Sequence, residues 1–594
     1  MDANIQNEPR KTDYIWLLNC ALITAVAAFL RFFALALKPF HHDEGVNGFF
    51  LNTLFRDGVY KYDPANYHGP TLYYISLAFA KVFGLETVTV RASVAIFGVL
   101  MVVLVFFLRR YIGKIGSLSA GLFLALSPGM VFISRYFIHE IFFVFLSLAI
   151  VIAVLFFIDK PKAGPFAVGW MVLLLLVCFL PSALILAGYM GGENATAVWA
   201  FRLAFFIVEA VLVFFVMRML LAWNGGRPIY LLLASASVAL MFATKETAFI
   251  TIGTMLIACL SLWIWQKIYQ GRVAESDSEE IFDSTITWTN FRAALGEGND
   301  IFLIAAAVAI AFIYVFVLFF SSFFTYPEGI QKAIDAYTIW TKTGSKDHTQ
   351  NGTWGYLKWG RDIEAPIFIL SALGTIIAFV WSRHRVAMFT GLWAFGLLAA
   401  YSLIPYKTPW LALSFILPMC IIAGYGINEL ARSKNIAAKA AAGLLAVSSA
   451  AVLAYQAYDV SFVRYDKDDR PYVYAHTKRE FLDMIAKIES YAEKSGKGKD
   501  AAIDIISPDY WPMVWYMREY PNAVFHGKFD NDDTAEMIVA KKGDQDRDVI
   551  ARFSAKYKYA GIYALRPGVD LVLLVRNDLA DGDAKDLYKL RNPN

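Results

Sequence analysis

The chain has 594 residues, of which 58% are hydrophobic and only 18% are charged, and its mean hydropathy is +0.49. A soluble globular chain carries about 25% charged residues, so this composition excludes a soluble protein and is typical of a polytopic helical membrane protein. The net charge of +4 is small and dispersed, which gives no indication of nucleic-acid binding.

Apolar runs long enough to cross a bilayer predict about 13 transmembrane helices. They lie near 14–37, 88–108, 115–133, 137–158, 165–188, 197–221, 228–243, 247–266, 301–323, 365–382, 386–404, 409–428 and 436–457. Arg and Lys gather in alternate turns, as in Arg109-Arg110 and Arg432-Lys434. Because positive charge is retained in the cytoplasm, the N-terminus is predicted to be cytoplasmic. An odd number of spans then places the segments 39–87 and 324–364 and the tail 458–594 outside the cytoplasm.

Four ionisable residues, His41-His42-Asp43-Glu44, follow the first predicted span. Charge at the mouth of a membrane helix is costly unless water, a partner or a reaction compensates it, so this stretch is the first candidate reaction centre. One carboxylate can act as a general base that takes a proton from an acceptor hydroxyl. Asp43 can instead cap the helix that follows, although a cap alone would not explain its neighbours His41, His42 and Glu44. Neighbours on a helix point about 100° apart, so Asp43 and Glu44 are not expected to address the same atom.

The external segment 39–87 is predicted to contain two interfacial helices. The first runs from Gly45 to Asp57, where Asp57-Gly58 ends it, and the second runs from Thr71 to Phe83. The turn Tyr67-His68-Gly69-Pro70 separates them. Helices that lie on the membrane surface can shape a cleft that faces the lipid.

Glu140 supplies a second acidic position, at the outer start of the fourth predicted span. An unpaired acid there is expensive, so it is expected to pair with Arg135, to face water, or to join Asp43 or Glu44 around an acceptor or a cation. A divalent cation on Asp43 and Glu140 is the one cofactor for which the sequence offers ligands. Adjacent histidines are not a metal-ligand spacing by themselves, so this indication is weak.

Three basic residues lie on the same predicted side, each beside a membrane boundary: Arg135, Lys245 and Lys407. Each can snorkel to the nearest headgroups, and Lys245 can simply neutralise Glu246 in a tight turn. As a set, they are predicted to hold a phosphate group near the outer leaflet, lysine as a point charge and arginine as a fork.

Two further segments interrupt the spans. Residues 270–297 are acidic and read as a cytoplasmic loop, whereas 324–364 is a long external connection rich in aromatic residues. Its length predicts a lid or a specificity element, although Trp and Tyr also anchor at interfaces. The residues predicted to contact the substrate are His41, His42, Tyr67, His68, His348 and Trp354.

The tail 458–594 is predicted to be a small, separate α/β domain that follows the transmembrane domain 1–457. Thr477-Lys478-Arg479-Glu480 has the pattern of a capping box, and apolar residues recur at helical spacing from Phe481 to Tyr491. Strands are predicted at 502–506, 537–540 and 571–575, and a helix at 546–556.

Together these motifs resemble the GT-C superfamily of polytopic glycosyltransferases, which includes protein O-mannosyltransferases and lipid A aminoarabinose transferases. More narrowly, they resemble the archaeal and bacterial proteins called flippase-activity-associated. The resemblance is carried by His41-His42-Asp43-Glu44-Gly45, Tyr67-His68-Gly69-Pro70, Ile404-Pro405-Tyr406-Lys407-Thr408-Pro409-Trp410 and Tyr472-Val473-Tyr474-Ala475-His476-Thr477.

The resemblance implies an enzyme of a prokaryotic plasma membrane that moves a sugar from a polyprenyl-phosphate donor to a lipid, glycan or protein acceptor on the extracytoplasmic face. It implies that Asp43 is the catalytic base, that Glu140 is the second acidic position, and that Lys245 and Lys407 meet the carrier phosphate. Many relatives have aspartate at the second position, so Glu140 departs from the pattern.

Other functions stay open at this level. The chain can be a non-catalytic accessory of lipid-linked sugar flipping, a component of a transporter, or a scaffold for glycan assembly. A transporter is expected to show internal repeats and ionisable residues at mid-membrane, and the sequence shows no convincing repeat. There is also no glycine-rich phosphate loop after a strand, which favours a lipid-linked donor over a nucleotide sugar.

Overall fold

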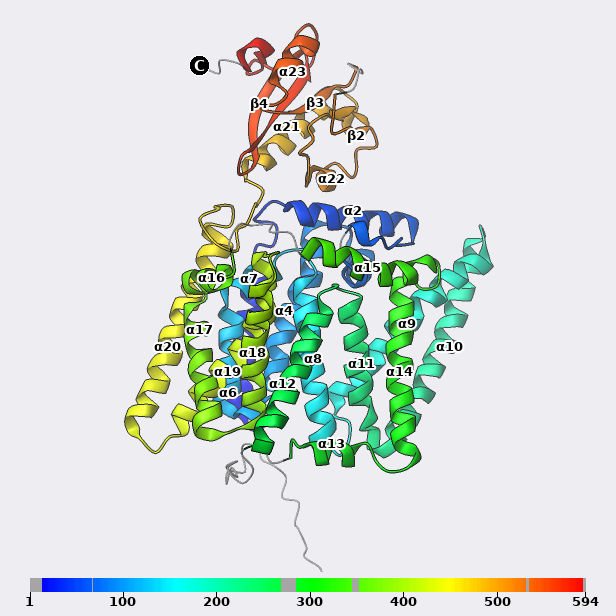
Figure 1. Ribbon diagram of the computed structural model, residues 1–594. Coiled ribbons are helices and arrows are strands. Elements are labelled where there is room, and N and C mark those ends of the chain that lie inside the picture. The colour runs from blue at the N-terminus through cyan, green and yellow to red at the C-terminus, as the bar shows by residue number, and fades with distance from the viewer. Residues whose placement is uncertain (1–12, 67, 269–284, 345–351, 530–533, 591–594) are drawn as a thin grey trace, which may run out of the picture.

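The computed structural model describes residues 13–66, 68–268, 285–344, 352–529 and 534–590. It shows a bundle of long helices with a small domain of helices and strands at one end (Figure 1). Within the described residues, 11 helices are long and apolar enough to cross a membrane, or 12 if one bent pair counts as a span. The chain is therefore a multi-pass integral membrane protein.

Each predicted span corresponds to helix. The long spans are α1 (Tyr14–Phe32), α4 (Thr87–Phe106), α8 (Glu140–Asp159), α9 (Pro165–Gly191), α10 (Ala195–Ala222), α12 (Ala248–Ile268), α14 (Asn299–Phe320), α17 (Ala365–Ile376), α18 (Arg385–Leu403), α19 (Leu413–Arg432) and α20 (Ile436–Tyr458). The predicted span 115–133 is the bent pair α6 (Lys114–Leu126) and α7 (Pro128–Ser134), which meet at 56°. The span 228–243 is α11 (Pro228–Phe242), a shorter helix of 15 residues.

The centre of the bundle is α19, whose apolar stretch is fully buried, whereas few residues of α1, α9, α14 and α20 are buried. Small residues allow α19 to approach α6 closely: a Cβ added to Gly424 would lie 2.3 Å from the carbonyl oxygen of Gly116. Close backbone approach through small residues is a common way to pack helices in membranes.

The first external segment forms α2 (His42–Asp57) and α3 (Thr71–Phe83), which confirms the two predicted helices. The first begins three residues earlier than predicted and ends at Gly58, whose positive φ of 74° suits glycine. The prediction that Asp43 caps this helix is wrong, because the cap is His41. The helix lies across the end of the bundle, beneath the tail domain (Figure 1).

The other soluble segments are also partly helical. The described part of 324–364 contains α15 (Glu328–Gly344) and α16 (Gly355–Ile363), at the same end of the bundle as α2 (Figure 1). The segment 270–297 is described from residue 285 onward and contains α13 (Trp288–Ala294) at the opposite end.

The tail folds as a six-stranded sheet of order β2-β1-β3-β5-β4-β6. Its strands are β1 (Ile503–Ile505), β2 (Ala523–Phe525), β3 (Met537–Lys541), β4 (Tyr557–Arg566), β5 (Val569–Arg576) and β6 (Lys585–Asp586). Strand β1 is parallel to β2 and β3, and the other pairs are antiparallel. The three predicted strands correspond to β1, β3 and β5, which are neighbours in the sheet.

A helix covers each face of this sheet. Met537 and Val539 pack with α21 (Glu480–Lys494), whereas Ile538 and Ala540 pack with α23 (Asp546–Phe553). Alternate side chains of a strand point to opposite faces, so β3 is apolar along its length because both of its faces are covered.

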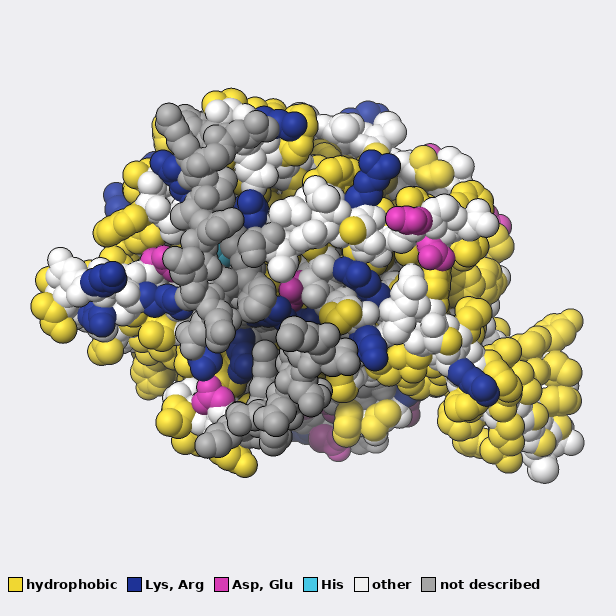
Figure 2. Space-filling model, turned by 90° about the horizontal axis from the view of Figure 1, so that it is seen from below, with side chains coloured by type: hydrophobic (Ala, Val, Ile, Leu, Met, Phe, Trp, Pro, Cys, Tyr) yellow, Lys and Arg dark blue, Asp and Glu magenta, His cyan; other side chains and the backbone are white. Residues whose placement is uncertain are grey.

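The two ends of the bundle differ in charge. The strand-bearing tail and α2 lie at one end, and the arginine- and lysine-rich turns after α4 and α8, between α17 and α18, and after α19 lie at the other. Figure 2 shows this second face, where dark blue Lys and Arg side chains recur.

We expect Gly424→Ala to destabilise the protein by about 1–3 kcal/mol, since overpacking a close-packed core has an effect of that size. The added methyl group would meet backbone atoms of α6, which cannot rotate away. Thermal unfolding of the purified protein in detergent measures the effect. The matched control is Gly443→Ala in α20, where a Cβ meets no atom within 4 Å. Equal unfolding temperatures for the two variants would contradict the proposed packing.

Candidate active site

The N-terminus of α2 is held by a capping box. The His41 Nδ1 atom accepts a hydrogen bond from the Asp43 backbone N–H at 3.0 Å, and Glu44 Oε2 accepts one from the His41 N–H at 3.0 Å. His41 Nε2 lies 3.1 Å from the Tyr474 carbonyl oxygen, so the Nε2–H tautomer satisfies both ring nitrogens. Burial also holds the pKa of His41 well below its usual value, and the ring is neutral at pH 7.

Glu44 forms a fully buried ion pair with Arg91 of α4. The Arg91 Nε and Nη2 atoms donate to the two carboxylate oxygens at 2.8 and 2.7 Å, and neither side chain is exposed. The Phe137 N–H adds a bond of 2.8 Å to Glu44 Oε1. Together with the His41 bond, these contacts engage both oxygens of Glu44. They give Glu44 a structural role, and its part in catalysis stays a prediction.

Asp43 points elsewhere, as helix geometry requires for the neighbour of Glu44. Its side chain is about 40% exposed, although protein surrounds it. Burial raises the pKa of Asp43 to about 7, with a further contribution from the negative charge of Glu140, while His68 and Lys245 act in the opposite direction. A carboxylate that is accessible and titrates near neutral pH is suited to general-base catalysis.

Glu140 pairs with Lys245, whose Nζ lies 2.6 Å from Glu140 Oε1, with both side chains buried. The expected pairing of Glu140 with Arg135 is therefore wrong, and so is the pairing of Lys245 with its neighbour Glu246. This pair brings the start of α8 against the turn between α11 and α12. The charges of both partners act on Asp43.

Glu246 instead contacts His68, with 3.0 Å between Oε2 and Nδ1. Burial opposes ionisation of Glu246, but the charge and hydrogen bond of His68 prevail and hold its pKa below the usual value. The two turns touch at Gly69, where an added Cβ would lie 2.1 Å from the Ala243 carbonyl oxygen. Only glycine fits this approach, which explains why the residue between His68 and Pro70 is glycine.

The other predicted phosphate ligands are engaged with backbone. Arg135 donates to the carbonyl oxygens that end α1, including those of Phe33 and Ala34 at 2.5 and 2.9 Å. Lys407 Nζ donates to the Ile404 carbonyl oxygen at 2.6 Å and is buried. Lys245 pairs with the carboxylate of Glu140, and phosphate binding by all three predicted cations stays a prediction.

The predicted substrate contacts are dispersed. His42 packs near Trp511 of the tail, with 6.1 Å between ring centroids, and burial together with the Arg566 charge lowers its pKa to about 4. Trp354 is 67% exposed at the start of α16. Tyr67 and His348 lie outside the described residues. None of these contacts is tested by the geometry, and they stay predictions.

Sequence reasoning missed Lys38. Its Nζ is buried 4.1 Å from the ring centroid of Phe132 and 4.6 Å from that of Tyr136, with no hydrogen-bond partner among the described residues. Burial lowers its pKa well below the usual value. His476 packs on the same two rings, at 5.1 and 5.5 Å. The position of Lys38 directly after the first predicted span is the sequence feature that could have identified it.

The predicted metal ligands do not form a recognisable metal site. Among the described residues, no group of three or more His, Cys, Asp and Glu side chains is arranged to hold a metal ion. The carboxylate of Glu140 is already neutralised by the ammonium group of Lys245. A divalent cation on Asp43 and Glu140 stays a prediction, and no chemical step is assigned to one.

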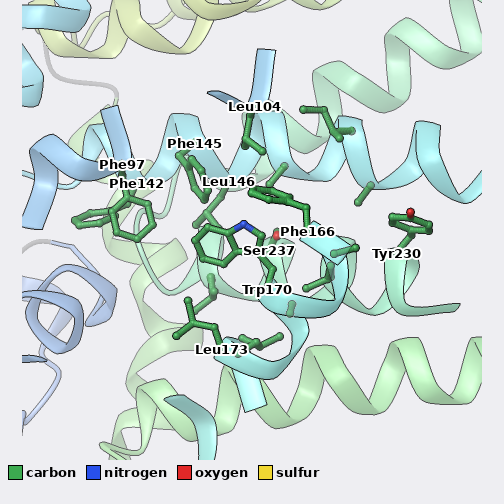
Figure 3. A pocket seen from close by; sticks show the side chains of 18 of the residues that line it. Phe97, Leu104, Phe142, Phe145, Leu146, Phe166, Trp170, Leu173, Tyr230 and Ser237 are labelled. Carbon is green, nitrogen blue, oxygen red and sulfur yellow. The ribbon is translucent and has the colours of Figure 1, made fainter. Parts of the chain in front are cut away.

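An apolar cavity of about 300 Å³ lies between α3, α4, α8, α9 and α11. Figure 3 shows its lining of aromatic rings and leucines, among them Phe97, Phe145 and Trp170. One end is at Thr71, whose N–H donates to the Ala243 carbonyl oxygen near Lys245. The other end is at Phe166 and Tyr230, where α9 and α11 begin at the opposite side of the bundle.

Comparison with known proteins agrees with this architecture. Residues 65–192, less than a quarter of the chain, match the family model of dolichyl-phosphate-mannose-protein mannosyltransferase. The structure is similar to ArnT from Cupriavidus metallidurans bound to undecaprenyl phosphate, with a TM-score of 0.57 and 13% identity over 96% of this chain and 100% of that one. The chain has a GT-C fold.

Two further comparisons complete the picture. ArnT from the same organism in the apo state gives a TM-score of 0.54 at 13% identity, covering 96% of this chain and 99% of that one. The Archaeoglobus fulgidus oligosaccharyltransferase tethered with an acceptor peptide gives a TM-score of 0.49 at 12% identity, covering 96% of this chain and 76% of that one. A search of curated proteins finds no match. The likeness to the two ArnT structures, both with TM-scores above 0.5, shows the GT-C fold and confirms the predicted fold class.

We expect Glu44→Gln to destabilise the protein by about 3–5 kcal/mol, because it leaves the buried Arg91 guanidinium without its counter-charge. Thermal unfolding in detergent, followed by size-exclusion chromatography, measures the loss. Glu328→Gln, on the exposed face of α15, is the matched control. An unchanged unfolding temperature for Glu44→Gln would show that the ion pair contributes little.

Proposed function

We propose that this GT-C protein is a glycosyltransferase that moves a sugar from a polyprenyl-phosphate carrier to a hydroxyl acceptor. The observation that carries the proposal is Asp43, an accessible carboxylate at the start of α2 with a pKa of about 7. The GT-C fold and the similarity to ArnT, described as bound to undecaprenyl phosphate, support it. The match of residues 65–192 to a mannosyltransferase family adds to that support.

In the proposed reaction, Asp43 removes the proton of the acceptor hydroxyl as its oxygen attacks the anomeric carbon of the donor. A new C–O bond forms, and the bond between the anomeric carbon and the phosphate oxygen breaks. The electron pair of that bond leaves with the polyprenyl phosphate. The proton stays on Asp43 until water removes it.

Lys245 is the proposed contact for the leaving phosphate. Its ammonium group has three donors, so it can keep its bond to Glu140 Oε1 and still donate to a phosphate oxygen. A preorganised positive charge at a water-poor site stabilises the charge that develops on a leaving group. Glu140 then serves to orient Lys245, which gives the second acidic position a role without a metal ion.

The apolar cavity is the proposed place for part of the carrier's isoprenoid chain. Its lining includes Thr71, whose N–H donates to the Ala243 carbonyl oxygen two residues before Lys245, and Tyr230 at the start of α11. Among its lining residues, only Thr71, Ser237 and Tyr230 carry hydroxyl groups. Such a lining suits a hydrocarbon chain and offers a sugar few hydrogen-bond partners. Because the lining suits the carrier's hydrocarbon chain better than a sugar, this cavity favours a glycosyltransferase over a protein that passes a sugar through the described part of the bundle.

We also propose that α2 and the tail domain face the outside of a prokaryotic plasma membrane. The turns rich in Arg and Lys lie at the opposite end of the bundle (Figure 2), and such turns remain in the cytoplasm. The donor would then be a carrier lipid presented on the outer leaflet, and the acceptor a lipid, glycan or protein.

Asp43→Asn is expected to lower turnover by at least about 100-fold, because general-base catalysis contributes roughly that much. The assay uses purified protein in detergent, a polyprenyl-phosphate sugar and a mixture of candidate acceptors. Asp57→Asn, at the exposed far end of the same helix, is the matched control. Turnover that survives Asp43→Asn would reject the assignment of the base.

The same assay across pH gives a second test. Since the base works in its ionised form, kcat/KM is expected to rise about tenfold per unit below pH 7 and to level off above it. Glu140, His68, Glu44 and Lys245 surround Asp43 electrostatically and set this midpoint. A profile that is flat between pH 5 and 7 at constant stability would be inconsistent with Asp43 as the base.

Sidedness is tested with engineered cysteines. Asp57→Cys in α2 is expected to react with a membrane-impermeant thiol reagent added to intact cells, whereas Glu297→Cys, at the opposite end of the bundle, is expected to react only after lysis. Both positions are exposed. The reverse pattern would place α2 in the cytoplasm, where a carrier on the outer leaflet cannot reach Asp43.

A further inference from the structure

A short segment of the tail domain touches the helix that carries Asp43. Residues 511–518, here called the docking segment, include α22 (Met513–Tyr516) and lie directly over α2 (Figure 1). Two glycines of α2 receive it. A Cβ on Gly45 would lie 2.7 Å from Pro512, and a Cβ on Gly48 would lie 2.6 Å from the Trp515 ring. Neither position has room for a larger residue.

The contact continues inward from Trp515 to the buried ion pair. The Trp515 ring stacks on Phe40, with 4.8 Å between centroids and 16° between planes. The Arg91 guanidinium also lies against Phe40, 4.9 Å from the ring centroid. Arg91 then binds Glu44, the residue after Asp43. Trp515, Phe40, Arg91 and Glu44 thus form a continuous column from the tail into the membrane domain.

Hydrogen bonds fix the docking segment at both sides of this column. The Trp515 Nε1–H donates to Thr87 Oγ1 at 3.1 Å, and the Phe40 N–H donates to the Tyr516 hydroxyl at 2.9 Å. Arg518 donates to the Leu85 carbonyl oxygen at 3.0 Å. These bonds join the docking segment to the segment before α2 and to the start of α4, which are the two elements that hold the capping box.

We infer that Trp515 is a positioning residue, and that the tail domain sets the place of Asp43 by docking on Gly45 and Gly48 of α2. The inference rests on the proposed function for its catalytic consequence. Its structural part rests on the contacts alone. The docking segment packs on α2 and contacts the segments that hold the capping box, and this capping box orients Asp43.

The first test measures the position of Asp43 without activity. In an Asp43→Cys background, Gly48→Ala is expected to raise the rate of labelling by a small charged thiol reagent at least about threefold, because the added methyl group would meet the Trp515 ring and displace α2. Gly443→Ala in α20, where a Cβ meets no atom within 4 Å, is the control. Equal rates in all three proteins would overturn the inference.

The second test measures the consequence for turnover. Gly48→Ala and Trp515→Leu are each expected to lower kcat about tenfold or more per folded molecule, since small misplacements of a catalytic group have effects of that size. The KM for the carrier is expected to change less than about twofold, because the proposed carrier contacts lie on other elements. The midpoint of the pH profile of kcat/KM is expected to fall, because water that reaches Asp43 lowers the pKa of its carboxyl group.

The double variant Gly48→Ala/Trp515→Leu separates docking from backbone effects. Removing the indole removes the clash, so the double variant is expected to be no slower than Trp515→Leu alone. Two losses that simply multiply, or kcat values equal to wild type in both single variants, would overturn the inference. Absence of transfer by the wild-type protein would instead reject the proposed function, and the labelling test would still decide whether the tail positions Asp43.

Discussion

The buried pair of Glu44 and Arg91 is the interaction on which the rest of this site depends. Arg91 also donates to the carbonyl oxygens of Leu35, Lys38 and Pro39, at 2.7, 2.9 and 3.1 Å. The Arg91 guanidinium therefore fixes the segment between α1 and α2 by hydrogen bonds, while Glu44 fixes the start of α2. A buried ion pair compensates its desolvation only when further hydrogen bonds satisfy both partners, and here both partners have them. The pair leaves Asp43 as the accessible acid.

The site around Asp43 is assembled from turns that lie far apart in the sequence. Glu140 and Lys245 are 105 residues apart, and His68 and Glu246 are 178 apart. Each pair neutralises charge that would be expensive at a membrane boundary. The result is a compact arrangement of charged groups, in which burial and the charge of Glu140 raise the pKa of Asp43 to about 7.

The sequence predicted the spans, α2, α3 and three strands because their signals are local: apolar run length, period and turn residues. It did not predict the pairings. Arg135 and Glu246 looked like the partners of Glu140 and Lys245 because they are close in sequence, yet the turns rotate them apart. The start of α2 was also missed, since histidine is not among the usual capping residues. Lys407, expected to reach a phosphate, donates to a carbonyl oxygen three residues away.

The seat of α22 on α2 restricts the route by which a molecule can reach Asp43. Approach along the membrane normal is closed on the side where Pro512 and Trp515 cover Gly45 and Gly48. The remaining directions lie nearer the membrane plane. Molecules already confined to that plane have a high local concentration there, whereas a bulky globular protein would have to present an extended segment. In the proposed reaction, α22 would therefore restrict the shape of the acceptor that can reach Asp43.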